Sequence, residues 1–131
     1  MLTESQSLLS SALLTLVMLL TASGLRSRAW TLAGLKIGFG NRERLPEPTP
    51  LSGRADRAAK NMLEGLLMFM AVVTAARFAG AESHRLELGA TAFFWARLAY
   101  FGVYLAGIAY LRTAIWVVSL AGIFMIGAAA L

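Results

Sequence analysis

The residues able to do chemistry in this chain are a few charged and polar side chains inside otherwise apolar stretches. Glu64, Arg97 and Arg112 lie within or at the edge of hydrophobic segments, and Asn61 precedes Glu64 by one helical turn. An ionisable side chain at the centre of a bilayer costs about 2.5–3.5 kcal/mol on insertion scales, so such residues usually face other helices or an aqueous cavity. Their positions therefore mark a candidate site.

Helical spacing arranges these residues in two stripes. Arg57, Asn61 and Glu64 stand at positions i, i+4 and i+7, which places them on one helix face, with Lys60 beside them. A second stripe at positions i, i+3 and i+7 consists of Arg97, Tyr100 and Tyr104. We expect the two stripes to face each other. We also predict an ion pair between Glu64 and Arg97, because each charge would otherwise be unpaired in hydrocarbon.

Cations and hydrogen-bonding groups dominate this set, so an anionic ligand suits it. Arginine holds carboxylates in a bidentate fork, and the Glu64 carboxylate can accept an ammonium group. Arg112 is followed directly by the hydroxyl of Thr113. These residues predict a site for a small zwitterionic ligand with several carboxylates. With one histidine and no cysteine, neither a metal site nor a cysteine nucleophile is expected.

The elements that position these residues are membrane-spanning helices. Of the 131 residues, 58% are hydrophobic and only 15% are charged, which is too apolar for a typical soluble domain. Four apolar stretches each have about the length of a transmembrane helix, near residues 8–25, 61–79, 88–110 and 113–130. They predict a single all-α domain over residues 1–131, an integral membrane four-helix up-down bundle.

The connections between the spans are short except for one. The stretch from about residue 38 to residue 53 holds all three prolines and is expected to form a loop. Ala29–Gly38 is expected to continue the first helix beyond the membrane, and Ser52 is a candidate N-cap for the next helix. A signal peptide is the competing interpretation of the first span, but it expects a basic leading segment, and Glu4 is the only charge there.

The basic residues indicate the orientation. Eight of the 12 lysines and arginines lie between the first and second spans: Arg26, Arg28, Lys36, Arg42, Arg44, Arg54, Arg57 and Lys60. The positive-inside rule places this loop in the cytoplasm and both termini on the other side of the membrane. Topology thus explains the net charge of +5, and no nucleic-acid partner is implied.

Several of these residues fall in runs that resemble one protein family. The run RADRAAKNMLEGLLMF at Arg54–Phe69 resembles the second-helix signature of the MAPEG family, the membrane-associated proteins in eicosanoid and glutathione metabolism. ARLAYFGVYLAG at Ala96–Gly107 is similar to the family's third helix. Arg112-Thr113 resembles the Arg-Ser/Thr pair at the start of its fourth helix, and GFGN at Gly38–Asn41 stands where its cytoplasmic loop begins. The likeness is to a bacterial-type member, which implies that the protein lies in a bacterial inner membrane.

The resemblance implies a homotrimer that binds glutathione, as a co-substrate, between neighbouring subunits near the cytoplasmic face. The implied activity is that of a glutathione S-transferase-like enzyme, which conjugates or reduces an apolar electrophile arriving from the bilayer. Arg112 and Thr113 are the candidate catalytic pair, because a cation near the thiol favours the nucleophilic thiolate. The candidate glutathione-binding residues are Arg57, Lys60, Asn61, Glu64, Arg97, Tyr100 and Tyr104.

Other interpretations of the same sequence stay open. A catalytically silent scaffold or subunit would bind another membrane protein through the same fold. A small multidrug exporter is a further possibility, but it expects an acidic residue in the first span, and residues 8–25 contain none. Small residues that allow close helix approach favour assembly into a trimer, namely Gly102, Ala106, Ala121, Gly122, Gly127 and Ala128.

Overall fold

The computed structural model describes residues 1–131, and every regular element in it is a helix. The five helices are α1 (Glu4–Ser27), α2 (Leu32–Phe39), α3 (Pro50–Phe78), α4 (Ser83–Ala106) and α5 (Ala109–Ala129). Four of them, α1, α3, α4 and α5, are long and apolar enough to cross a membrane. The prediction of an all-α fold with four spans is therefore confirmed.

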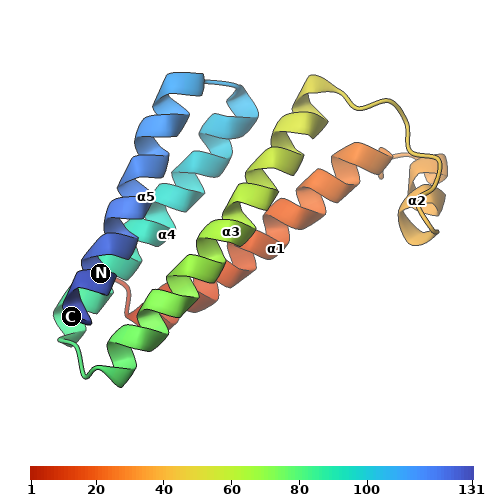
Figure 1. Ribbon diagram of the computed structural model, residues 1–131. Helices are drawn as coiled ribbons and strands as arrows, with labels where there is room; N and C mark the ends of the chain where they lie inside the picture. Colours follow the sequence, from red (N-terminus) through yellow and green to blue (C-terminus); the bar gives the residue numbers. More distant parts are fainter.

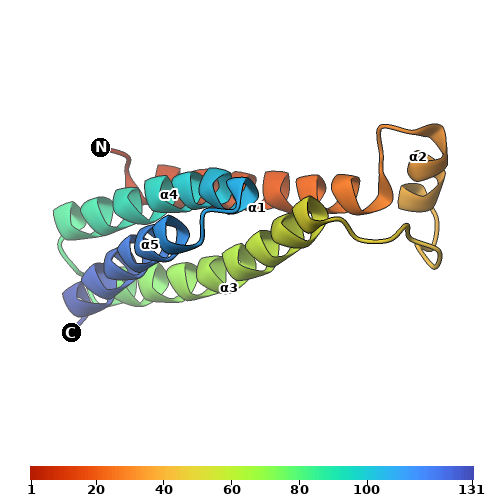
Figure 2. The same ribbon diagram turned by 90° about the horizontal axis from the view of Figure 1, so that it is seen from above.

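The four long helices run alternately up and down, so both termini lie at the same end of the molecule (Figure 1). α4 and α5 form a hairpin, α1 packs against α3 and α4, and α3 also contacts α5. Figure 2 shows α1 and α3 continuing past the α4–α5 turn towards the short helix α2, which lies apart from the bundle. The basic connection predicted to lie outside the membrane is thus at the end opposite to the termini.

The start of α3 differs from the sequence prediction. Thr49, and not Ser52, is the N-cap: its hydroxyl accepts from the Ser52 backbone N–H at 3.1 Å, and the Ser52 hydroxyl accepts from the Thr49 N–H at 2.9 Å. Pro50 opens the helix instead of belonging to the loop, because a missing N–H is harmless in the first turn. Ser52 therefore belongs to the capping box as the residue that bonds back to the N-cap, and the prediction that it is the N-cap itself is wrong.

The expected continuation of the first helix through Ala29–Gly38 is also wrong. α1 ends at Ser27, because Arg28 adopts a left-handed conformation with φ 57°, and α2 is a separate helix. Gly34 of α2 lies against the backbone of Arg28, where a Cβ atom would collide with the Arg28 carbonyl. The chain therefore turns back on itself at the end of α1.

The α4–α5 turn lies earlier than expected. Gly107, with φ 79°, ends α4 at Ala106, and α5 starts at Ala109, whereas the sequence favoured a turn after residue 110. Glycine adopts this left-handed conformation without steric cost, and such a residue commonly ends a helix. As a result, Arg112 projects from the first turn of α5 and does not lie in the connection.

Close backbone contact holds the α4–α5 hairpin together. A Cβ atom on Gly122 would lie 2.6 Å from the Gly89 carbonyl oxygen, and one on Gly89 would lie 2.8 Å from the Gly122 oxygen. Gly122, proposed from sequence as a contact between subunits, is therefore used within the chain. Gly102 has nothing near its would-be Cβ atom and stays available for an external contact.

Candidate functional site

Six residues from three helices line a pocket of about 260 Å³ close to the α4–α5 turn. They are Asn61 from α3, Tyr100 and Tyr104 from α4, and Arg112, Thr113 and Trp116 from α5. Five of the six belong to the nine site residues expected from the sequence. α3 contributes because it contacts both helices of the hairpin, and Arg57 of α3 donates to Tyr104 beside this turn.

Arg112 supplies the positive charge of this pocket, and Tyr104 lies against it. The Arg112 guanidinium lies over the Tyr104 ring, 4.5 Å from its centroid, and the side chain is half-buried. The Tyr104 hydroxyl accepts a hydrogen bond from Arg57 Nε at 3.2 Å. Because that hydroxyl acts as acceptor towards Arg57, its own proton remains free to be donated to a ligand. The pocket thus offers a cation and a directed hydroxyl to a developing anion.

The Thr113 hydroxyl is engaged differently. It donates to the backbone carbonyl of Ala109, one turn earlier in α5, at 3.2 Å. Its oxygen lone pairs, and not its proton, are therefore available to the pocket in this arrangement. Of the pair at the start of α5, only Arg112 offers donors directly.

Arg97 is fully buried behind the pocket, with 1% of its surface exposed. Its Nη1 donates to Asn61 Oδ1 at 2.6 Å, and its guanidinium lies 5.4 Å from the ring centroids of both Phe93 and Tyr100. Gly65 makes room for it, since a Cβ atom there would collide with the guanidinium. Arg97 therefore fixes the Asn61 amide at the wall of the pocket.

These contacts confirm that the two stripes face each other, but the predicted Glu64–Arg97 ion pair is wrong. Arg97 bonds to Asn61 instead, and the Glu64 side chain is exposed on the outer surface of the chain. The buried face of α3 is formed by residues such as Ala58, Met62 and Gly65. Asn61 lies at the edge of that face and Glu64 lies beyond it, so only the amide reaches Arg97.

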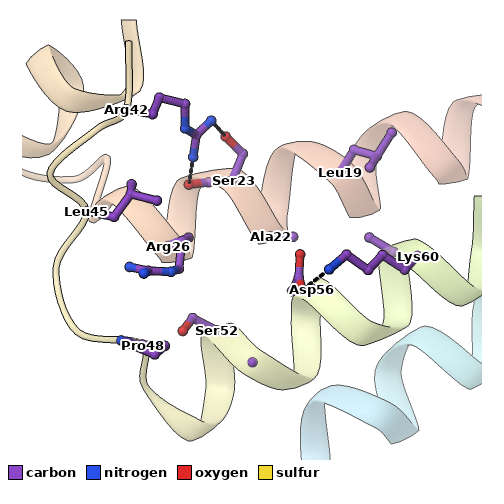
Figure 3. Close-up of a pocket in the computed structure, with 12 residues that line it drawn as sticks. Leu19, Ala22, Ser23, Arg26, Arg42, Leu45, Pro48, Ser52, Asp56 and Lys60 are labelled. Atoms are coloured by element: carbon purple, nitrogen blue, oxygen red, sulfur yellow. Dashed lines mark hydrogen bonds and ion pairs between the residues drawn. The ribbon is translucent and has the colours of Figure 1, made fainter. Parts of the chain in front are cut away.

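Lys60 and Arg57 lie on the outer side of α3. Lys60 forms an ion pair with Asp56 at 3.0 Å and lines a second cavity beside α1, drawn in Figure 3. Arg57 is exposed but joins the first pocket through its bond to Tyr104. The structure thus joins Arg57, Asn61 and Arg97 to the pocket and leaves Lys60 and Glu64 outside it.

Two residues near the pocket were missed by sequence reasoning. Trp116 lines it at position i+4 from Arg112, so the helical period of α5 contained the signal. Arg54 Nε donates to the Leu105 carbonyl at 3.0 Å and so ties α3 to the last turn of α4. Nothing in the sequence distinguished Arg54 from the other loop cations, because its role depends on where α4 ends.

The fold and site define a class: an integral membrane helical bundle with a cation-and-tyrosine pocket at one end. The sequence profile of the MAPEG family matches residues 7–131, nearly the whole chain. The chain therefore belongs to the MAPEG family, and it is an integral membrane protein. No curated protein is similar enough to the chain to count as a match.

Proposed function

We propose that the protein is a glutathione-dependent membrane transferase that acts on apolar electrophiles. The observation that carries the proposal is the pocket itself, which gathers Asn61, Tyr100, Tyr104 and Arg112 from three helices. These are positions at which the chain resembles the glutathione-binding residues of the family, and the family includes glutathione transferases.

The chemistry assigned to the pocket is thiolate formation and attack. The Arg112 guanidinium stabilises the thiolate of bound glutathione after its proton has passed to solvent, and the Tyr104 hydroxyl donates to the same sulfur. The sulfur then forms a bond to the electrophilic carbon, and the electron pair leaves with the departing group or moves to a neighbouring heteroatom. Asn61, held by Arg97, orients the peptide part of the ligand.

We propose that the site is completed by a neighbouring subunit in a homotrimer. The pocket volume of about 260 Å³ is small beside the roughly 300–1,000 Å³ of typical ligand pockets. Glu64 is an exposed carboxylate in the middle of an apolar helix, and a second subunit would cover it and let it receive the ligand's ammonium. The small residues Gly102, Ala106 and Ala121 are exposed and suit such packing.

The orientation proposed for the protein places this pocket on the cytoplasmic side. Eight of the 12 basic residues lie in or beside the connection between α1 and α3, at the same end as the α4–α5 turn. The positive-inside rule then puts both termini outside the cytoplasm. A cytoplasmic site suits a water-soluble thiol, while the apolar substrate arrives through the bilayer.

Titration of the purified protein with glutathione tests the proposal. We expect binding heat and a thermal shift at millimolar glutathione, a large excess over ordinary ligand dissociation constants. Arg112→Ala should lower the bound thiolate fraction, followed by ultraviolet absorbance, by about tenfold and lower affinity less. Arg44→Ala, which removes an exposed loop cation outside the pocket, is the matched control.

Two results would overturn the proposal. Absence of any glutathione binding would favour the alternative, a catalytically silent scaffold that binds another membrane protein. Equal loss of thiolate and of affinity in Arg112→Ala would show that Arg112 only holds the ligand and has no part in activating the thiol.

A further inference from the structure

A second cavity, of about 450 Å³, lies between the end of α1, the start of α3 and the connecting segment 40–49 (Figure 3). It shares no lining residue with the pocket that Tyr100, Tyr104 and Arg112 line near the α4–α5 turn. Three cations line it, Arg26, Arg42 and Lys60, against a single carboxylate, Asp56. The cavity therefore carries an excess of two positive charges.

The two arginines hold the connecting segment over the cavity. Arg42 Nη1 donates to the Ser23 hydroxyl at 2.6 Å and its Nη2 to the Ser23 carbonyl at 3.4 Å, as drawn in Figure 3. Arg26 Nη1 donates to the Pro46 carbonyl. Neutral oxygens accept these bonds, so neither positive charge is neutralised by a carboxylate. Each guanidinium carries five N–H donors, and most remain unused.

The third cation is only weakly held. Lys60 pairs with Asp56 at 3.0 Å, but the two side chains are 70% and 52% exposed. An ion pair so open to solvent adds little to stability, so Lys60 can turn to another anion. Ser52 and Gly53, in the first turn of α3, also line the cavity, and the positive end of the helix dipole adds to the attraction for an anion.

The floor of the cavity is apolar and points towards the bilayer core. Leu19 and Ala22 of α1 and Ala59 of α3 line it, about one to two helical turns deeper than Arg26 and Ser52, and Lys60 lies beside Ala59 at the same depth. The two arginines thus lie at the outer end of the cavity and the apolar side chains at its inner end, with Lys60 as the one cation near that inner end (Figure 3). An anionic lipid has this polarity, with a phosphate in the headgroup layer and acyl chains below.

We propose that this cavity binds the phosphate of an anionic phospholipid headgroup, with the acyl chains lying along α1 and α3. The bound lipid bridges the connecting segment, α1 and α3 through one phosphate. It fastens the α1–α3 pair where that pair extends beyond the α4–α5 hairpin (Figure 2). The site stands apart from the proposed glutathione pocket and does not depend on it.

Lipid retention by the full-length protein tests the proposal. The protein in detergent is offered phosphatidylglycerol, phosphatidylcholine or inorganic phosphate, and retained lipid is measured by native mass spectrometry alongside the thermal midpoint. We expect phosphatidylglycerol to be held about tenfold or more tightly than phosphatidylcholine, and inorganic phosphate to cause no comparable stabilisation. The variant Arg26→Gln/Arg42→Gln should lose this preference.

The matched control is Lys36→Gln/Arg44→Gln, which removes one exposed charge of α2 and one of segment 40–49, neither of which lines the cavity. It should keep the preference, since net charge alone is not the cause. If the double pocket variant does not fold, Arg42→Gln alone serves, because its side chain reaches α1 from the connecting segment and lies outside the helices. Glutathione titration of each variant reports on the other pocket separately.

Three results would overturn the proposal. Equal retention of phosphatidylglycerol and phosphatidylcholine would exclude selection of the anionic headgroup. An equal loss of the preference for phosphatidylglycerol in the pocket and control variants would show that general surface charge causes it. Stabilisation by inorganic phosphate as large as that by phosphatidylglycerol would identify a soluble phosphate-bearing ligand as the occupant and exclude the lipid.

Discussion

The contact between the buried Arg97 and the half-buried Asn61 predicts a specific energetic coupling between α3 and α4. Arg97 is 1% exposed, donates to Asn61 Oδ1 at 2.6 Å, and its Nε already lacks a hydrogen-bond partner. Asn61→Leu removes the only side chain that accepts a hydrogen bond from this guanidinium. The cation–π contacts with the Phe93 and Tyr100 rings then remain. A hydrogen bond to a charged group contributes about 1.5–3 kcal/mol, so we expect the free energy of unfolding to fall by about that amount.

The second variant removes the charge and keeps the bulk. Arg97→Met relieves the desolvation of a buried cation, and its main cost is an Asn61 amide without its partner, so we expect a loss of about 1 kcal/mol or less. In Asn61→Leu/Arg97→Met both polar groups are gone, and we expect much of the stability to return. The coupling energy from the complete cycle should then be about 1.5 kcal/mol or more.

The assay is equilibrium unfolding in mixed micelles, driven by rising mole fraction of sodium dodecyl sulfate and followed by far-ultraviolet circular dichroism, without glutathione. Thr74→Leu, an exposed polar-to-leucine change on the same helix, is the control and should stay within about 0.5 kcal/mol of the parent protein. A coupling energy below about 0.5 kcal/mol would refute the reasoning, because Asn61 would then do nothing for the buried charge.

Two further variants test the structural supports of the site in the same assay. Gly122→Ala places a Cβ atom 2.6 Å from the facing Gly89 carbonyl oxygen and should destabilise the α4–α5 hairpin by about 1–3 kcal/mol. Gly24→Ala in α1, whose added Cβ atom would meet no atom closer than 3.8 Å, is the control and should not destabilise; similar values for the two would contradict the close backbone contact. Thr49→Ala removes the N-cap of α3 and should cost about 1 kcal/mol; no measurable loss would contradict the capping geometry seen at Thr49.

Much of the fold followed from sequence because its causes are local. Four apolar stretches of membrane-spanning length and a polar, proline-containing connection were enough to predict the four long helices. The helical period also predicted that the stripe of Arg57 and Asn61 would face that of Arg97 and Tyr104, and the two hydrogen bonds between them agree. Buried polar groups need partners, which made this pairing predictable.

The predictions that were wrong concern the ends of helices, which depend on the backbone conformation of a few residues. Gly107 ends α4 with a left-handed φ, which moved the turn and placed Arg112 on the first turn of α5. Thr49 and Ser52 both carry capping hydroxyls, and only the backbone geometry distinguishes the cap from its partner. Hydropathy changes too gradually along the chain to place such boundaries to within a residue.

Residue types and their period predicted four helices long and apolar enough to span a membrane and a cationic, tyrosine-containing stripe inside the bundle. They could not say which partner Arg97 takes, because spacing gives the angle of a side chain around its own helix but not the rotation of that helix against its neighbours. That rotation brings the half-buried Asn61 against the buried Arg97, exposes Glu64 and turns Lys60 towards the cavity beside α1. The second cavity is hidden for the same reason, since it exists only where a folded-back segment meets two helix ends.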